Sequence, residues 1–77
     1  MVNNPEIVFG IIGKKLKQMR LESGYTSYET FAVDHDLSRR HYWAAEAGKQ
    51  ISLMYLMKIL NIHKCQIDVF FNQLNAT

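Results

Sequence analysis

The sequence predicts a small all-α protein, and three observations support this fold class. Apolar residues recur every three to four positions along most of the chain, which is the spacing of one helix face. Helix-breaking residues are few, with one proline and four glycines in 77 residues. No stretch shows the alternation of apolar and polar residues that is typical of a half-buried strand. We therefore expect a compact five-helix bundle with short turns.

The composition is that of a single globular domain, expected to span residues 1–77. Hydrophobic residues make up 48% and charged residues 21%, which is too apolar for a disordered chain. No apolar run has the length of a membrane span, and the first residues lack the pattern of a secretory signal. Cysteine occurs once, so no internal disulfide is expected. These features predict a cytoplasmic protein.

Positive charge is clustered rather than large. The net charge of +2 does not by itself indicate a nucleic-acid partner. Basic residues gather at two places in the sequence, namely Lys14, Lys15, Lys17 and Arg20, and then Arg39 and Arg40. Charge alone favours the interpretation that both groups are solvated helix surfaces.

The first helix is expected to run from Pro5 to about Ser23. Asn4 is a favourable N-cap because its side chain accepts hydrogen bonds from unpaired amides, and proline suits the first helical position. Ser23 and Gly24 form a stop signal. The apolar face of this helix is predicted to comprise Val8, Ile12, Leu16 and Met19.

Two short helices separated by a turn of about three residues are expected over residues 27–47. Ser27 and Ser38 are their N-caps, and Gly48 ends the second helix. The inner face of the first is predicted to contain Phe31, Ala32 and His35. The second has one side with Tyr42, Ala45 and Glu46, and an opposite side with Arg39, Arg40, Trp43 and Ala47. Such a turn leaves one face of the second helix exposed, and the major groove of DNA admits one α-helix.

Two more helices are expected in the last third of the chain. Ser52 caps the first of them, and its apolar stripe is predicted to be Leu53, Leu56, Met57 and Leu60. The final short helix contains Ile67, Phe70 and Phe71. In a chain of this length, at least one of the two phenylalanines must close the core.

Arg39 and Arg40 are the most informative functional feature. They occupy the first turn of a predicted helix, where the positive end of the helix dipole disfavours cations. A bound anion reverses this effect, because free amides and guanidinium groups then face phosphates or guanine acceptors together. Two exposed arginines without a role are the alternative interpretation.

From about Ile12 to Phe71 the sequence resembles the phage-repressor and Cro-type helix-turn-helix family, also called the XRE family. The matching segments are residues 17–20 (Lys-Gln-Met-Arg), 27–32 (Ser-Tyr-Glu-Thr-Phe-Ala), 37–40 (Leu-Ser-Arg-Arg) and 46–49 (Glu-Ala-Gly-Lys). Residues 53–60 and 67–71 match the fourth and fifth helices of the family. The resemblance implies a lambda-repressor-like DNA-binding domain in which residues 38–47 form the recognition helix.

The resemblance also implies roles for individual residues. Base contacts are expected from Arg39, Arg40, Trp43 and Ala44, although alanine is a departure from the longer polar residue usual at its position. Contacts to the DNA backbone are expected from Ser27, Tyr28, Ser38, His41 and Lys49, with Lys15 or Lys17 as further candidates. In the alternative interpretation, each of these side chains is solvated and has no DNA contact. For Trp43 the alternative is that it covers part of the core or a partner surface.

Two further positions are expected to serve structure. Arg20 and Glu46 match a pair that forms a partly buried salt bridge in relatives, and a buried carboxylate needs such a partner. Asp36 stands where the family turn usually has glycine with a positive φ, which aspartate tolerates better than most residues. His35 replaces a common leucine and is expected to be a hydrogen-bonded, half-buried ring.

No catalytic, metal-binding or cofactor-binding arrangement is expected. His63 and Cys65 are too few to form a metal site, and neither a phosphate-binding glycine loop nor a Ser/His/Asp arrangement is found. We therefore expect a non-enzyme without cofactors, membrane contacts or a small-molecule substrate.

Two classes of function remain open. The first is a transcriptional regulator that binds double-stranded DNA as a homodimer, with residues 67–71 and the nearby Met54 and Tyr55 forming a self-complementary patch. The second is a protein-interaction module on the same fold, similar to an antitoxin, which uses Tyr42, Trp43 and the small surface of residues 44–45.

Overall fold

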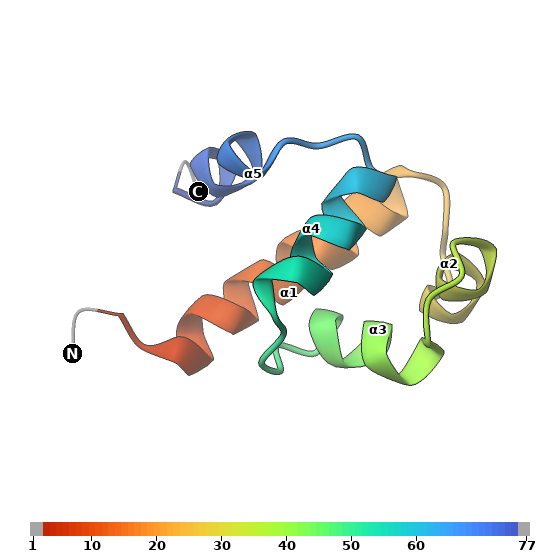
Figure 1. Ribbon diagram of the computed structural model, residues 1–77, viewed down its shortest axis with the longest axis horizontal. Helices are drawn as coiled ribbons and strands as arrows, with labels where there is room; N and C mark the ends of the chain where they lie inside the picture. The colour runs from red at the N-terminus through yellow and green to blue at the C-terminus, as the bar shows by residue number, and fades with distance from the viewer. Residues whose placement is uncertain (1–2, 76–77) are drawn as a thin grey trace.

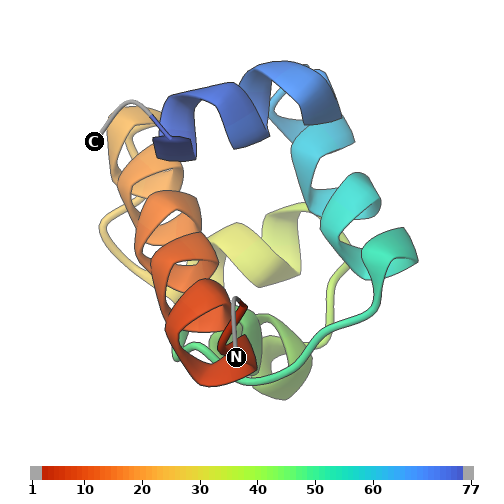
Figure 2. The same cartoon turned by 90° about the vertical axis from the view of Figure 1, so that its left-hand side faces the viewer.

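The structure, a computed structural model, describes residues 3–75, and within them it contains five α-helices and no strand. The helices are α1 (Pro5–Glu22), α2 (Tyr28–Asp34), α3 (Arg39–Glu46), α4 (Leu53–Ile62) and α5 (Ile67–Asn75). The predicted all-α fold class is therefore confirmed. The long helix α1 crosses the molecule, with α3 below it in Figure 1 and α5 on the opposite side. Viewed along the long axis, the helices are arranged around the middle of the molecule (Figure 2).

Four helices begin at the predicted capping residues. The side chain of Asn4 accepts hydrogen bonds from the amides of Glu6 (3.0 Å) and Ile7 (3.4 Å) at the start of α1. Serine hydroxyls cap α2, α3 and α4 in the same way, at distances of 3.3, 3.3 and 3.0 Å to the amide three residues later. These bonds satisfy amides that have no partner inside the helix, so the predicted helix starts are confirmed.

Each of these four helices is followed, two residues after its last residue, by a residue in the left-handed conformation. The φ angles are 92° at Gly24, 58° at Asp36, 85° at Gly48 and 54° at Lys64. At the end of α2, the amide of Leu37 donates to the Ala32 carbonyl over 2.8 Å, which completes a Schellman motif. The positive φ expected at Asp36 is confirmed, whereas the one at Lys64 was not predicted.

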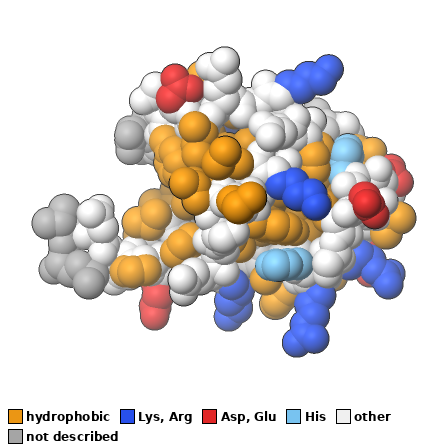
Figure 3. All heavy atoms as spheres, viewed as in Figure 1, with side chains coloured by type: hydrophobic (Ala, Val, Ile, Leu, Met, Phe, Trp, Pro, Cys, Tyr) orange, Lys and Arg blue, Asp and Glu red, His pale blue; other side chains and the backbone are white. Residues whose placement is uncertain are grey.

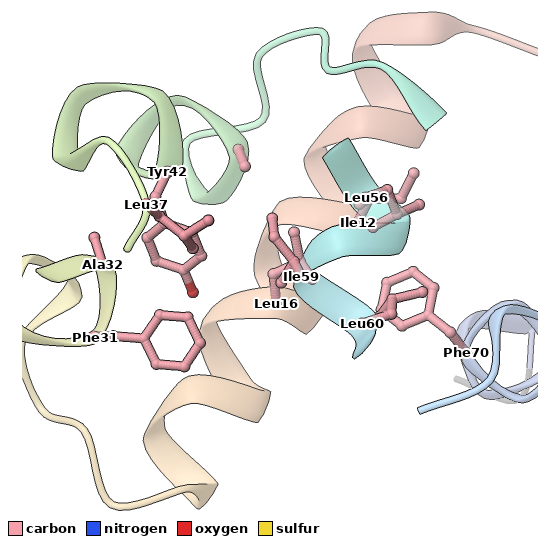
Figure 4. Packing of buried hydrophobic residues seen from close by; sticks show 11 residues of the cluster. Ile12, Leu16, Phe31, Ala32, Leu37, Tyr42, Leu56, Ile59, Leu60 and Phe70 are labelled. Atoms are coloured by element: carbon pink, nitrogen blue, oxygen red, sulfur yellow. The ribbon is translucent and has the colours of Figure 1, made fainter. Parts of the chain in front are cut away.

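One hydrophobic core joins all five helices. Its largest fully buried side chains are Tyr42, Phe31, Phe70, Leu16, Ile59 and Leu60. The rings of Phe31 and Tyr42 lie 5.0 Å apart between α2 and α3, and Phe70 reaches in from α5 beside Leu60 (Figure 4). Phe70 is thus the phenylalanine that closes the core.

The predicted apolar stripe of α4 is partly wrong. Leu56 and Leu60 are buried as expected, but Leu53 is 59% exposed and Met57 is 44% exposed, and Ile59 is buried instead. Because α4 is apolar around most of its circumference, the sequence determines its helical period but not which face turns inward. Val8, in the first half of α1, is also exposed rather than part of the core.

Candidate nucleic-acid interface

The orientation of α3 is determined by the residues on its inner side. Tyr42 and Ala45 are buried against α1 and α2. On α1, Gly13 faces the end of α3, and a β carbon at Gly13 would lie 2.6 Å from the Glu46 carbonyl oxygen and 2.8 Å from that of Ala45. The two helix backbones therefore approach each other closely, and glycine is required at the contact.

An ion pair joins the same two helices. Arg20 Nε lies 2.7 Å from Glu46 Oε2, Arg20 Nη2 donates to Glu46 Oε1 over 3.1 Å, and Arg20 Nη1 donates to the Tyr25 carbonyl over 2.8 Å. The hydrogen bond to Glu46 raises the pKa of the Arg20 guanidinium. Burial raises the pKa of the Tyr42 phenol, so this ring stays neutral beside the pair. The pair that the resemblance implied is present, and it holds α3 against α1.

The opposite side of α3 is open. Arg39, Arg40 and His41 are exposed, Ala44 is half-buried, and Trp43 keeps 47% of its surface exposed. Trp43 is not one of the buried residues that form the hydrophobic core. The structure thus brings the four expected base-contacting residues together on one outward surface.

The expected backbone-contacting residues lie at the ends of the motif helices. Ser27 and Ser38 are N-caps, so their hydroxyls already accept bonds from Thr30 and His41. Tyr28 is half-buried at the start of α2, and Lys49 is exposed just beyond α3. In Figure 3, Lys and Arg side chains project from the lower edge, where Figure 1 places α3.

The histidines have structural contacts that the sequence showed only in part. His35 is half-buried and its Nδ1 donates to the Phe31 carbonyl over 2.9 Å, which confirms the expected hydrogen-bonded ring. His41 stacks on Tyr55 of α4, with ring centroids 4.5 Å apart and planes at 14°. His63 stacks on Phe31 at 5.3 Å. Both stacks join residues far apart in sequence, so no local signal predicts them.

Among residues 3–75, no three His, Cys, Asp or Glu side chains come together in an arrangement that holds a metal ion. Cys65 is a free thiol. No helix within this range is long and apolar enough to cross a membrane.

The five-helix architecture and the pair α2–α3 define a small all-α protein with a helix-turn-helix arrangement. The chain is 46% identical over 48 residues to a protein described as control protein C.MunI from Mycoplasma sp. The match covers 61% of this chain and 65% of that protein, so it spans less than two thirds of the relative. No model of a known protein family matches the chain. No solved structure matches it either.

Proposed function

We propose that this protein is a transcriptional regulator that binds double-stranded DNA specifically by inserting α3 into the major groove. The observation that carries the proposal is the exposure of Arg39 and Arg40 at the N-terminal turn of a helix whose other side is buried. Cations at this end of a helix dipole are unfavourable unless an anion lies beside them. The similarity to a protein described as a control protein supports a regulatory role.

The proposed interface has two parts. Arg39, Arg40, Trp43 and Ala44 face the bases, where arginine donors match the O6 and N7 acceptors of guanine. Ser27, Tyr28, Ser38, His41 and Lys49 face the phosphates and set the position of the domain without determining sequence. Because neutralised phosphates release counterions, binding is expected to weaken as salt concentration rises.

A homodimer is the proposed assembly, and an apolar groove between α1, α4 and α5 is its proposed interface. The groove is lined by Val8, Phe9, Ile12, Leu53, Leu56 and Phe71. Figure 3 shows the apolar side chains that gather between these helices. A second copy of the chain is the occupant that suits DNA binding, since a two-fold dimer places two recognition helices on half-sites about 34 Å apart.

Analytical ultracentrifugation of wild type and Leu53→Lys tests the dimer. We expect wild type to dimerise and Leu53→Lys to sediment as a monomer, because a charge in the groove opposes burial. Val33→Lys is the matched control, since Val33 is an exposed apolar residue on α2. A wild type that remains monomeric up to high micromolar concentration, or a dimer that Leu53→Lys leaves intact, contradicts this interface.

An electrophoretic shift with mixed genomic fragments tests the function. We expect wild type to shift DNA at low salt and Arg39→Ala/Arg40→Ala to lose the shift while its circular dichroism spectrum is unchanged. Lys14→Ala/Lys58→Ala removes the same charge from exposed positions on α1 and α4 and should leave the shift. If both double variants lost the DNA shift equally, the loss would be explained by net charge alone and not by the position of Arg39 and Arg40.

A protein-interaction module is the second candidate, favoured by the exposed indole of Trp43. Aromatic side chains of this kind are enriched at protein interfaces. Absence of any DNA binding by wild type at low salt supports this candidate over the first.

A further inference from the structure

The outward surface of α3 is divided into a cationic part and an apolar part. Arg39 and Arg40 in the first turn provide only hydrogen-bond donors. Farther along the helix, the outward residues Trp43 and Ala44 provide no acceptor, and Ala44 offers only a methyl group. None of the four side chains proposed to face the bases is therefore suited to the donor groups of adenine N6 or cytosine N4.

A hollow lies beside Ala44 at the junction of these two parts. It is lined by Ser38, Arg40, His41 and Ala44. The Ser38 hydroxyl accepts the His41 amide over 3.3 Å, and the His41 ring is stacked on Tyr55. The Ser38 hydroxyl and the His41 ring are thus held by these contacts at the rim, which leaves the Arg40 guanidinium and the Ala44 methyl group to meet a base.

We infer that this hollow receives the 5-methyl group of a thymine whose neighbouring base pair contains a guanine bound by Arg40. This inference deepens the proposed DNA-binding function and rests on it. Among the four bases, thymine alone presents an apolar group in the major groove, and guanine alone presents two acceptors there. The side chains at residues 40 and 44 lie one helical turn apart, so they face neighbouring positions along the groove.

The methyl contact predicts a measurable discrimination between thymine and uracil, which differ only in that group. Burying one methyl group against an apolar side chain changes affinity roughly fourfold. Removing the Ala44 side chain by Ala44→Gly should remove the discrimination, so that thymine and uracil duplexes bind equally.

The experiment begins with a duplex selected from a random DNA pool by the wild-type protein. Each thymine is then replaced singly by uracil, and binding is measured for wild type, Ala44→Gly and Ala47→Gly. Ala47→Gly makes the same chemical change at the end of the same helix but outside the hollow. Circular dichroism checks that both variants are folded.

We expect one thymine per half-site, beside a guanine, at which uracil weakens wild type and Ala47→Gly about fourfold but leaves Ala44→Gly unaffected. If wild type tolerates uracil at every position while Arg40→Ala abolishes binding, the inference fails and the DNA-binding function stands. Equal sensitivity of wild type and Ala44→Gly at the critical thymine also overturns it. If no duplex is selected at all, the proposed function fails as well.

Discussion

Arg20 near the end of α1 and Glu46 at the end of α3 form a two-point ion pair, with Nε to Oε2 at 2.7 Å and Nη2 to Oε1 at 3.1 Å. The two side chains are only 5% and 8% exposed. The third guanidinium contact, to the Tyr25 carbonyl, ties the loop after α1 to the same site. Helix α3 is therefore held in place by an interaction on its hidden side, distinct from the surface proposed to meet DNA.

Breaking this pair should strongly destabilise the protein. Glu46→Ala leaves the Arg20 charge buried without its partner, which typically costs about 3 to 5 kcal/mol. Urea unfolding measures the change. The control is Glu22→Ala, because Glu22 is exposed at the end of α1 and its removal should change stability by less than about 0.5 kcal/mol. Similar small effects for the two variants would show that the ion pair contributes nothing.

The contact between α1 and α3 predicts opposite effects at two glycines of one helix. Gly13→Ala drives a β carbon into the carbonyls of Ala45 and Glu46, and overpacking of this kind costs about 1 to 3 kcal/mol. Gly10→Ala meets no described atom within 4 Å, so its better helix propensity should stabilise by up to about 1 kcal/mol. Thermal unfolding of both variants checks this. If both substitutions stabilised the protein, α1 and α3 would be able to move apart at Gly13 without a cost in free energy.

The left-handed residue after α4 is a site for stabilisation. Lys64 has φ 54°, a conformation that costs an L-residue about 1 to 2 kcal/mol and glycine almost nothing. Lys64→Gly should therefore raise the free energy of unfolding by about 1 kcal/mol. Asp36→Gly at φ 58° is the comparison and should gain less, because aspartate tolerates this region better. A loss of stability in Lys64→Gly contradicts the argument.

His63 should make the protein less stable in mild acid. Its Nδ1 lies 3.3 Å from the Ser23 hydroxyl, whereas its buried Nε2 has no partner among the described residues. Burial, and then the nearby His35, lower the pKa of His63 below its ordinary value of 6.5. Since the unfolded chain binds this proton more readily, stability is full above pH 6.5 and falls as pH drops through that value, levelling off below the folded-state pKa.

The pH effect is measured by urea unfolding at several pH values for wild type and His63→Phe, which keeps a ring against Phe31. His35 and His41 are present in both proteins, so the difference between the curves reports the titration of His63 together with its interaction with His35. We expect wild type to lose more stability than the variant between neutral pH and pH 5. Parallel curves for the two proteins would exclude His63 as the source.

Lys49 should contribute to DNA affinity without contributing to sequence preference. It is exposed just beyond α3, where a phosphate contact is proposed. Lys49→Ala should weaken binding to specific and unrelated duplexes by a similar factor and reduce the slope of log affinity against log salt by about 0.9. Lys58→Ala on α4 serves as the control with an unchanged slope. A change confined to the specific duplex would instead indicate base recognition.

The sequence by itself determined the fold class and the starts of α1, α2, α3 and α4, because the interactions responsible are local. Asn4, Ser27, Ser38 and Ser52 each satisfy amides within the next three residues. A capping residue acts on its own helix wherever that helix packs, so its signal is readable without coordinates. The outward position of Arg39 and Arg40 followed in the same way from the helical period of their neighbours.

The tertiary structure alone decided which face of α4 turns inward and which distant residues meet. Leu53 and Met57 are as apolar as Ile59, so their exposure depends on what α1 and α5 leave uncovered. The stacking of His41 on Tyr55 and the close approach of Gly13 to Glu46 likewise depend on how the helices cross. Burial and contact between helices are properties of the whole packed core, and no short stretch of sequence contains them.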